Sequence, residues 1–152
     1  SAPLIRTDRG GQVTWHGPGQ LVVYTLIDLQ RMGIGIRDYV TLIENAIIVF
    51  LTQYGVSAAS RREAPGVYVG GAKIASVGLK VTRGRCYHGF SLNVNPDLAA
   101  FDCINPCGYE GLKVTSLERL GVSTTPDEVM PGIISAYLAD PAFQNSTHHE
   151  RT

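Results

Sequence analysis

Apolar residues recur at three- and four-residue steps between positions 36 and 54. This spacing places them along one side of an α-helix, which is therefore predicted to pack that side against a core. Gly55 follows directly, where helices commonly end in the left-handed conformation that glycine tolerates. The apolar positions of this predicted helix are Ile36, Val40, Ile43, Ile47, Phe50 and Tyr54.

Strands are predicted from runs that are rich in β-branched and aromatic residues. The run at 21–28 is one, and the runs at 66–69, 72–82 and 86–95 are three more, separated by glycine-containing turns. Their apolar content is typical of strands that are buried on at least one face. These runs therefore predict a sheet that packs against the helix.

A second helix is predicted near the C-terminus, because Thr125-Pro126-Asp127-Glu128 has the form of a capping box. Pro131 follows closely, so this helix is expected to begin at Asp127 or to be kinked. A helix, several strands and a second helix indicate an α+β fold with a mixed or mostly antiparallel sheet.

Length and composition indicate one globular domain over residues 1–152. Hydrophobic residues make up 44% and charged residues 17%, which is unlike a disordered chain. The net charge is zero, so nucleic acid is not an expected partner. No apolar run approaches the roughly 18 residues needed to cross a bilayer, and no secretory signal is visible. A protein of the cytoplasm, or of an organelle matrix after processing, that does not associate with membranes is expected.

The chain has three cysteines, Cys86, Cys103 and Cys107. An odd number argues against a disulfide scaffold and fits a reducing compartment. Cys103 and Cys107 are four positions apart rather than three, and the four histidines have no zinc-finger spacing, so no metal site is predicted.

Charge is distributed unevenly, because no acidic residue lies between Glu63 and Asp97. A basic patch there could steer an acidic partner. Charged residues on edge strands that only prevent aggregation explain the same pattern equally well. The basic residues of this stretch are Lys73, Lys80, Arg83 and Arg85.

Three segments differ from ordinary core or surface sequence. Residues 9–20 are rich in glycine, which lets backbone N–H groups approach a ligand closely. A simple glycine-rich hairpin turn is the alternative, and the intervening Arg9, Thr14 and His16 favour a binding site. Lys73, in the second segment, follows two glycines in a predicted strand. It is either an exposed strand lysine or a partly desolvated one, and desolvation suits a lysine to proton transfer.

The third segment holds Cys107 between Pro106 and Gly108. Most cysteines are small buried apolar residues, an interpretation that suits Cys86 and Cys103. A cysteine in a proline–glycine turn is instead expected to present an oriented thiol, and a nearby cation would raise its thiolate fraction.

Together and in this order, these segments resemble the octanoyltransferase (lipoate-protein ligase B) family. The resemblance spans residues 6 to about 120, and the C-terminal helix adds nothing specific to it. The motifs are R-G-G-Q-V-T-W-H-G-P-G-Q at 9–20, G-V-Y-V-G-G-A-K-I-A-S-V-G at 66–78, H-G-F-S-L-N-V-N at 88–95 and I-N-P-C-G-Y-E-G at 104–111.

The resemblance implies the α+β fold of biotin and lipoate protein ligases, which is class II synthetase-like, with a mixed sheet packed against helices. It implies an acyltransferase that moves octanoyl from the phosphopantetheine of acyl carrier protein to a lysine of a lipoyl domain, in lipoate biosynthesis. The acceptors would be 2-oxoacid dehydrogenases and the glycine cleavage H protein. No cofactor is implied beyond the arm of the carrier protein.

The resemblance also implies the roles of individual residues. Cys107 would be the nucleophile, forming a thioester with the acyl group, and Lys73 would activate its thiol. The implied substrate-binding residues are Arg9, Gly10, Gly11, Gln12, Val13, Thr14, Trp15, His16, Ser76, Val77, Gly78, Gly89, Phe90 and Ser91.

The chain departs from the family at its start, where only eight residues precede Arg9. Family members usually carry a longer segment there, so the N-terminal part is expected to be missing and apolar surface to be exposed where it would pack. Trp15 stands where the family often has tyrosine, which keeps the aromatic bulk and loses the hydroxyl.

Three rival interpretations stay open. An ATP-dependent biotin or lipoate ligase shares the fold, forms an acyl-adenylate and needs no cysteine nucleophile. A non-catalytic protein could bind acyl carrier or lipoyl domains. A hydrolase could pair Cys107 with His16 or His88.

Overall fold

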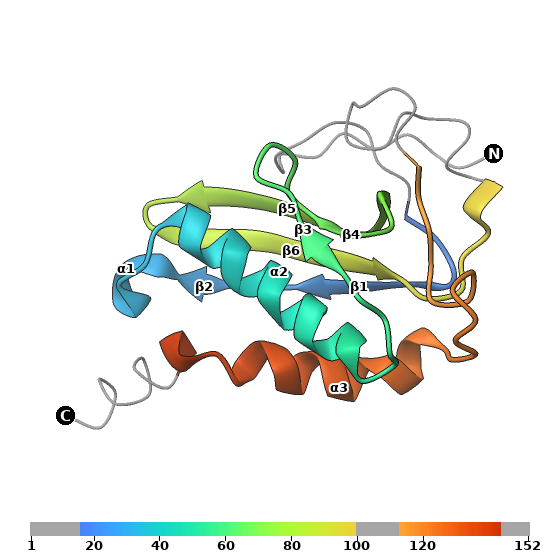
Figure 1. The fold of residues 1–152 in the computed structure, drawn as a ribbon. Helices are drawn as coiled ribbons and strands as arrows, with labels where there is room; N and C mark the ends of the chain where they lie inside the picture. Colours follow the sequence, from blue (N-terminus) through green and yellow to red (C-terminus); the bar gives the residue numbers. More distant parts are fainter. Residues whose placement is uncertain (1–15, 100–112, 144–152) are drawn as a thin grey trace.

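The computed structural model of the chain describes residues 16–99 and 113–143, and its ribbon is drawn in Figure 1. Strands alternate with helices early in the chain, a long hairpin follows, and a helix comes last. The helices and strands are β1 (Gln20–Tyr24), β2 (Ile27–Asp28), α1 (Leu29–Met32), α2 (Ile36–Thr52), β3 (Ala59–Ser60), β4 (Val67–Val69), β5 (Ala72–Thr82), β6 (Arg85–Asn93) and α3 (Pro126–Leu138).

The six strands form one sheet in the order β1-β6-β5-β4-β3, with β2 also paired to β6. Every pair of these named strands is antiparallel. β1 and β2 pair with β6 in one continuous register, interrupted only at Thr25 and Leu26. The strand predicted at 21–28 therefore exists as two pieces, and the three later strands are confirmed as β4, β5 and β6.

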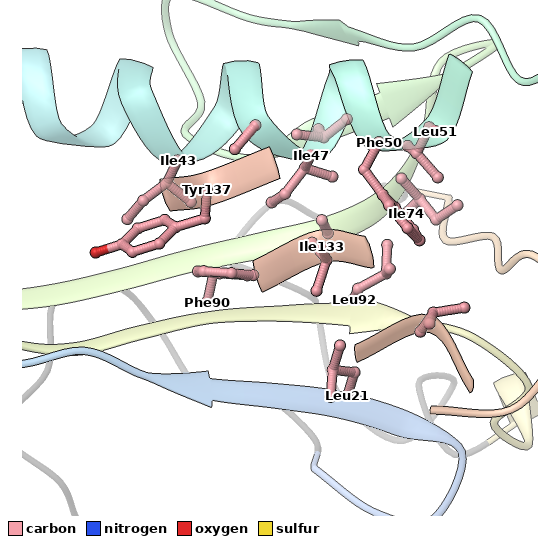
Figure 2. Close-up of a cluster of buried hydrophobic side chains, with 14 of the residues drawn as sticks. Leu21, Ile43, Ile47, Phe50, Leu51, Ile74, Phe90, Leu92, Ile133 and Tyr137 are labelled. Carbon is pink, nitrogen blue, oxygen red and sulfur yellow. The ribbon is translucent and has the colours of Figure 1, made fainter. Parts of the chain in front are cut away.

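Helices α2 and α3 cover one face of the sheet, and the core lies between these layers (Figure 1). Figure 2 shows side chains from both helices and from the sheet pointing into this layer. Burying each such side chain is worth roughly 1.5–3 kcal/mol relative to leaving it exposed. Labelled members of the cluster are Leu21, Ile43, Ile47, Phe50, Leu51, Ile74, Phe90, Leu92, Ile133 and Tyr137.

The prediction of an amphipathic helix is confirmed by α2. Ile43, Ile47 and Phe50, in the middle of the predicted apolar stripe, are buried. Ile36 and Tyr54, at its ends, are 39% and 37% exposed. The buried face is turned slightly from the predicted stripe, because it also includes Tyr39, Leu42, Ala46 and Leu51.

The predicted capping box is also confirmed, at the start of α3. The Thr125 side chain accepts a hydrogen bond from the Glu128 N–H and donates one to the Glu128 carboxylate. Pro126 occupies the first turn, where its missing N–H costs nothing. The helix continues through Pro131. Within the described residues, α1 and β3 are the elements that the hydropathy pattern did not predict, and both are very short.

Two large apolar side chains are exposed where β1 ends, at the edge of the described sheet. Tyr24 is 78% and Leu26 is 68% exposed. Among the helices in the described ranges, none has the length and apolar character needed to cross a bilayer.

Candidate active site

Lys73 lies near the start of β5 and is buried, with only 3% of its surface exposed. Its backbone N–H donates to the Lys113 carbonyl at 2.8 Å, and its carbonyl accepts from the Thr115 N–H at 2.9 Å. Residues 113–115 thus pair in parallel with β5 at this point. On the other side of β5, Tyr68 of β4 is the register partner of Lys73. The lysine is therefore held by backbone pairing on both sides.

A buried carboxylate lies close to this lysine. Glu44 of α2 is 6% exposed, and its side chain accepts a hydrogen bond from the Gly66 N–H at 2.8 Å. Burial raises the pKa of the Glu44 carboxyl, although the Gly66 hydrogen bond and the positive charge of Lys73 act in the opposite direction. Since an isolated buried charge is very costly, this arrangement compensates both groups.

A second polar network connects residue 16 to the segment beside Lys73. His16 Nδ1 lies 2.6 Å from Gln20 Oε1, and Gln20 Nε2 donates to Asn93 Oδ1 at 2.8 Å. Asn93, which is buried, donates from Nδ2 to the Thr115 carbonyl at 3.1 Å. The network therefore ties the start of β1, the end of β6 and the residues that pair with Lys73.

The predicted substrate-binding residues on β5 and β6 divide between the two faces of the sheet. Ser76 pairs with Ser91, and Gly78 pairs with Gly89. Directly paired residues of an antiparallel sheet point to the same face, and successive residues alternate. These four small residues therefore share the face opposite the helices.

Val77 and Phe90 are the remaining pair, and they point toward the helices. The Phe90 ring lies 6.2 Å from the Tyr137 ring of α3, and Figure 2 shows both in the core. Phe90 is 4% exposed. The structure thus places Phe90 in the core layer and separates it from the row of small residues.

Several predicted site residues lie outside the described ranges. They are Arg9, Gly10, Gly11, Gln12, Val13, Thr14, Trp15 and Cys107, and Cys103 lies there too. Cys86 is described, and its interpretation as a small buried residue is confirmed. It is fully buried, and this burial raises the pKa of its thiol.

The basic residues of the acid-free stretch do not form one patch. Arg83 and Arg85 are exposed at the turn between β5 and β6, with the half-buried Lys80 near them. Lys73 is buried toward the other end of β5. A surface that steers an acidic partner would therefore consist of the hairpin residues without Lys73.

Sequence reasoning missed Glu44 and Asn93. Glu44 lies four residues after Val40 and three before Ile47, so it shares the apolar side of the predicted helix. A single acidic residue on such a face was the available signal. In the described part of the chain, no three His, Cys, Asp or Glu side chains are grouped in a way that could hold a metal ion.

Comparison with known proteins identifies the family. The family model for the lipoyl protein ligase A/B catalytic domain matches residues 1–138. An octanoyltransferase of Methylococcus capsulatus is 64% identical over 120 residues, covering 79% of this chain and 58% of that protein. One of Halorhodospira halophila is 51% identical over 148 residues, covering 96% of this chain and 68% of the relative. The chain spans about three fifths of the length of the first curated relatives.

Solved structures share the fold at low sequence identity. A lipoate-protein ligase A bound with ATP has a TM-score of 0.70 at 17% identity, covering 86% of this chain and 55% of that one. A biotin protein ligase from Aquifex aeolicus has a TM-score of 0.63 at 14% identity, covering 88% and 56%. The predicted fold class is thereby confirmed. By its family match and its relatives, the chain belongs to the lipoyl protein ligase A/B catalytic domain family and, within it, to the octanoyltransferases.

Proposed function

We propose that this chain transfers an octanoyl group from acyl carrier protein to a lysine of a lipoyl domain, with Cys107 as nucleophile and Lys73 as the group that activates it. Relatives with 48–64% identity that are named octanoyltransferase support the reaction. The position of the buried Lys73 supports the assignment of the two residues.

One observation carries this assignment: Lys73 pairs with the segment that directly follows the cysteine motif. The Lys73 N–H donates to the Lys113 carbonyl. Cys107 precedes Lys113 by six positions, and six residues of extended chain span at most about 20 Å. The proposal therefore requires only a six-residue connection to bring Cys107 to Lys73, although 34 positions separate the two residues in the sequence.

In the first step, the Cys107 thiolate attacks the carbonyl carbon of the carrier thioester. The bond to the phosphopantetheine sulfur breaks, and that sulfur leaves as a thiolate that takes up a proton. Lys73, as an ammonium group, would favour the attacking thiolate. Exchange between a thiol and a thioester is nearly isoenergetic, so this step needs no ATP.

In the second step, the amine of the acceptor lysine attacks the Cys107 thioester. An amide bond forms, the Cys107 thiolate leaves, and the amine loses a proton that Lys73, when neutral, could accept. Backbone N–H groups of the glycine-rich 9–16 loop could hold the developing oxyanion, an interaction often worth about 3 kcal/mol.

We place the acyl chain beside the row of small residues, of which Ser76 and Gly78 are half-buried and Gly89 and Ser91 are buried. Ser76, Gly78, Gly89 and Ser91 share one face and project little. Burying about seven apolar carbons at ~0.8 kcal/mol each would contribute roughly 5 kcal/mol. That is enough to favour octanoyl over acetyl, but neighbouring chain lengths would differ by only about 1–3 kcal/mol.

The decisive experiment follows the acyl group on the intact protein. Incubation with octanoyl-acyl carrier protein, without ATP, is expected to add one octanoyl group by mass spectrometry. Cys107→Ser should abolish the adduct, and a lipoyl domain should remove it from the wild type as an amide product. Absence of the adduct in the wild type would indicate binding alone, and a requirement for ATP would indicate a ligase.

The exposed hairpin basic residues Arg83 and Arg85 supply a candidate docking surface for these partners. Acyl carrier proteins and lipoyl domains are generally acidic, so opposite charge would speed their encounter. Raising the ionic strength from about 0.05 M to about 0.5 M should then lower kcat/KM several-fold, because salt screens exposed charges. A rate that does not change with salt would exclude this surface.

A further inference from the structure

Gly66 lies between the two buried charged residues of the site. Its N–H donates to Glu44 Oε2 at 2.8 Å. A Cβ atom at Gly66 would lie 2.6 Å from Lys73 Cε, 2.8 Å from the Ala75 carbonyl oxygen and 3.4 Å from Lys73 Nζ. The bare Cα of Gly66 thus leaves the space through which the end of the lysine side chain passes. Its φ of +139° is likewise a conformation that favours glycine.

Glu44 fixes the backbone at this point. It extends from the middle of α2, a helix whose buried face is otherwise apolar, to the start of β4. A buried carboxylate is retained at a cost that an apolar side chain would avoid. Accepting the Gly66 N–H and facing the charge of Lys73 are the two compensations that Glu44 has here.

We propose that Glu44 and Gly66 are positioning residues for Lys73: the Glu44 carboxylate anchors the Gly66 backbone, and glycine at position 66 keeps open the path of the lysine side chain. Neither residue has to touch the substrate. The inference rests on the proposed function in that the lysine being positioned is the one that activates Cys107.

The first pair of variants tests the glycine. Gly66→Ala is expected to displace the lysine and to lower kcat of octanoyl transfer by about tenfold or more, with KM for the carrier within about threefold. Gly70→Ala reports the effect of an alanine at a positive φ without a steric contact, because Gly70 has a φ of +56° and a Cβ there meets nothing within 4 Å. Gly66→Ala adds the contacts with Lys73 and with the Ala75 carbonyl oxygen and a φ of +139° that suits alanine less well. Glu44→Leu leaves glycine at position 66, so it tests the position of Lys73 without these backbone effects.

The second pair tests the carboxylate. Glu44→Leu removes the acceptor of the Gly66 N–H and is expected to lower kcat by about tenfold. Glu44→Gln keeps an oxygen acceptor of the same length and should recover most of that loss. A glutamine variant as slow as the leucine variant would overturn the proposal that Glu44 positions Lys73 by anchoring Gly66. A leucine variant with the kcat of the wild type would overturn it as well.

A readout independent of catalysis separates this inference from the proposed function. The chain has three lysines, Lys73, Lys80 and Lys113, so competitive acetylation followed by mass spectrometry gives the reactivity of Lys73 against two internal references. Gly66→Ala and Glu44→Leu should raise the relative labelling of the buried Lys73 by about threefold or more, as its side chain is displaced toward solvent.

Labelling of Lys73 in Gly66→Ala that equals labelling in Gly70→Ala would overturn the inference, whatever the transfer rate. Labelling that rises while the wild type forms no octanoyl adduct would leave the positioning role standing and refute the proposed function. Thermal unfolding of all four variants identifies any that fails to fold. If one does, the kcat and the Lys73 labelling of Glu44→Gln decide whether the positioning role holds.

Discussion

The core beneath α2 and the surroundings of Lys73 are both buried, but the core consists of apolar side chains and the surroundings of Lys73 include polar and charged ones. The core contains Ile47, Phe50 and Leu92, whose burial needs no partner beyond close packing. Around Lys73 the chain buries Glu44 and Asn93, each of which depends on a specific hydrogen bond. The first region could be repacked with other apolar residues of similar volume.

Apolar side chains in place of this polar region would stabilise the fold at least as well, because their burial requires no hydrogen-bonding partners. The buried polar groups of this region form hydrogen bonds that connect α2, the residue before β4, β6 and the segment at 113–115. The proposed chemistry lies in this polar region, beside Lys73.

The largest effect is expected at Lys73. Lys73→Met keeps the length of the side chain but removes the ammonium group, and octanoyl transfer should fall by about 100-fold or more. Lys80→Met, also on β5 but half-buried, should cost less than about threefold. Rates measured with folded protein, verified by circular dichroism, decide this. A Lys73→Met enzyme within about tenfold of the wild type would refute the assigned role.

A truncation in the apolar core should affect stability and leave the chemistry intact. Ile47 is fully buried, so Ile47→Ala is expected to lower the free energy of unfolding by about 2–5 kcal/mol. Val49, on the same helix, is 57% exposed, and Val49→Ala should change it by less than about 0.5 kcal/mol. Urea titration measures both. Equal effects would contradict the assignment of the buried face.

A polar truncation should affect both properties. Asn93→Ala removes the partner of Gln20 and of the Thr115 carbonyl, which should cost about 1–3 kcal/mol of unfolding free energy. Transfer should also slow, because the segment beside Lys73 loses a support. Asn45→Ala, at an exposed position of α2, is the control for both measurements. Wild-type activity in Asn93→Ala would show that the network is only structural.

The smallest effect concerns Glu44 and pH. Because burial raises the pKa of the Glu44 carboxyl, its contribution to stability is present at acidic pH and is lost as the pH rises through the folded-state pKa. Glutamine at position 44 does not titrate, so the Tm of Glu44→Gln minus that of the wild type should increase as the pH rises from about 4 to about 8. Calorimetry at several pH values tests this, and a difference that grows on acidification would contradict it.

The helices that were predicted from the sequence are marked by residues close to their own ends. The capping box at Thr125 and the apolar period leading to Gly55 each lie within a few residues of the helix end that they mark. The break at Thr25 and Leu26 was not visible, because both residues suit a strand. The two-residue β3 and the four-residue α1 are too short to show any period.

The site could be predicted only in part, for a related reason. The residues around Lys73 left open whether its side chain is exposed or desolvated, and the family resemblance singled it out. Its neighbours Glu44, Gly66 and Thr115 come from three distant segments, and no local pattern relates them. The separation of Phe90 from the row of small residues likewise depends on strand register, which the sequence alone did not fix.

The hydroxyl groups of Tyr39 and Tyr137 meet at 2.7 Å inside the core, although 98 positions separate the two residues. This bond joins the first turn of α2 to the last turn of α3, so neither of these helix ends can loosen without breaking a buried polar contact. Backbone amides of the two helices should therefore exchange their hydrogens with deuterated water in a single slow phase. The last described helix is therefore expected to open together with α2, rather than as a fraying end.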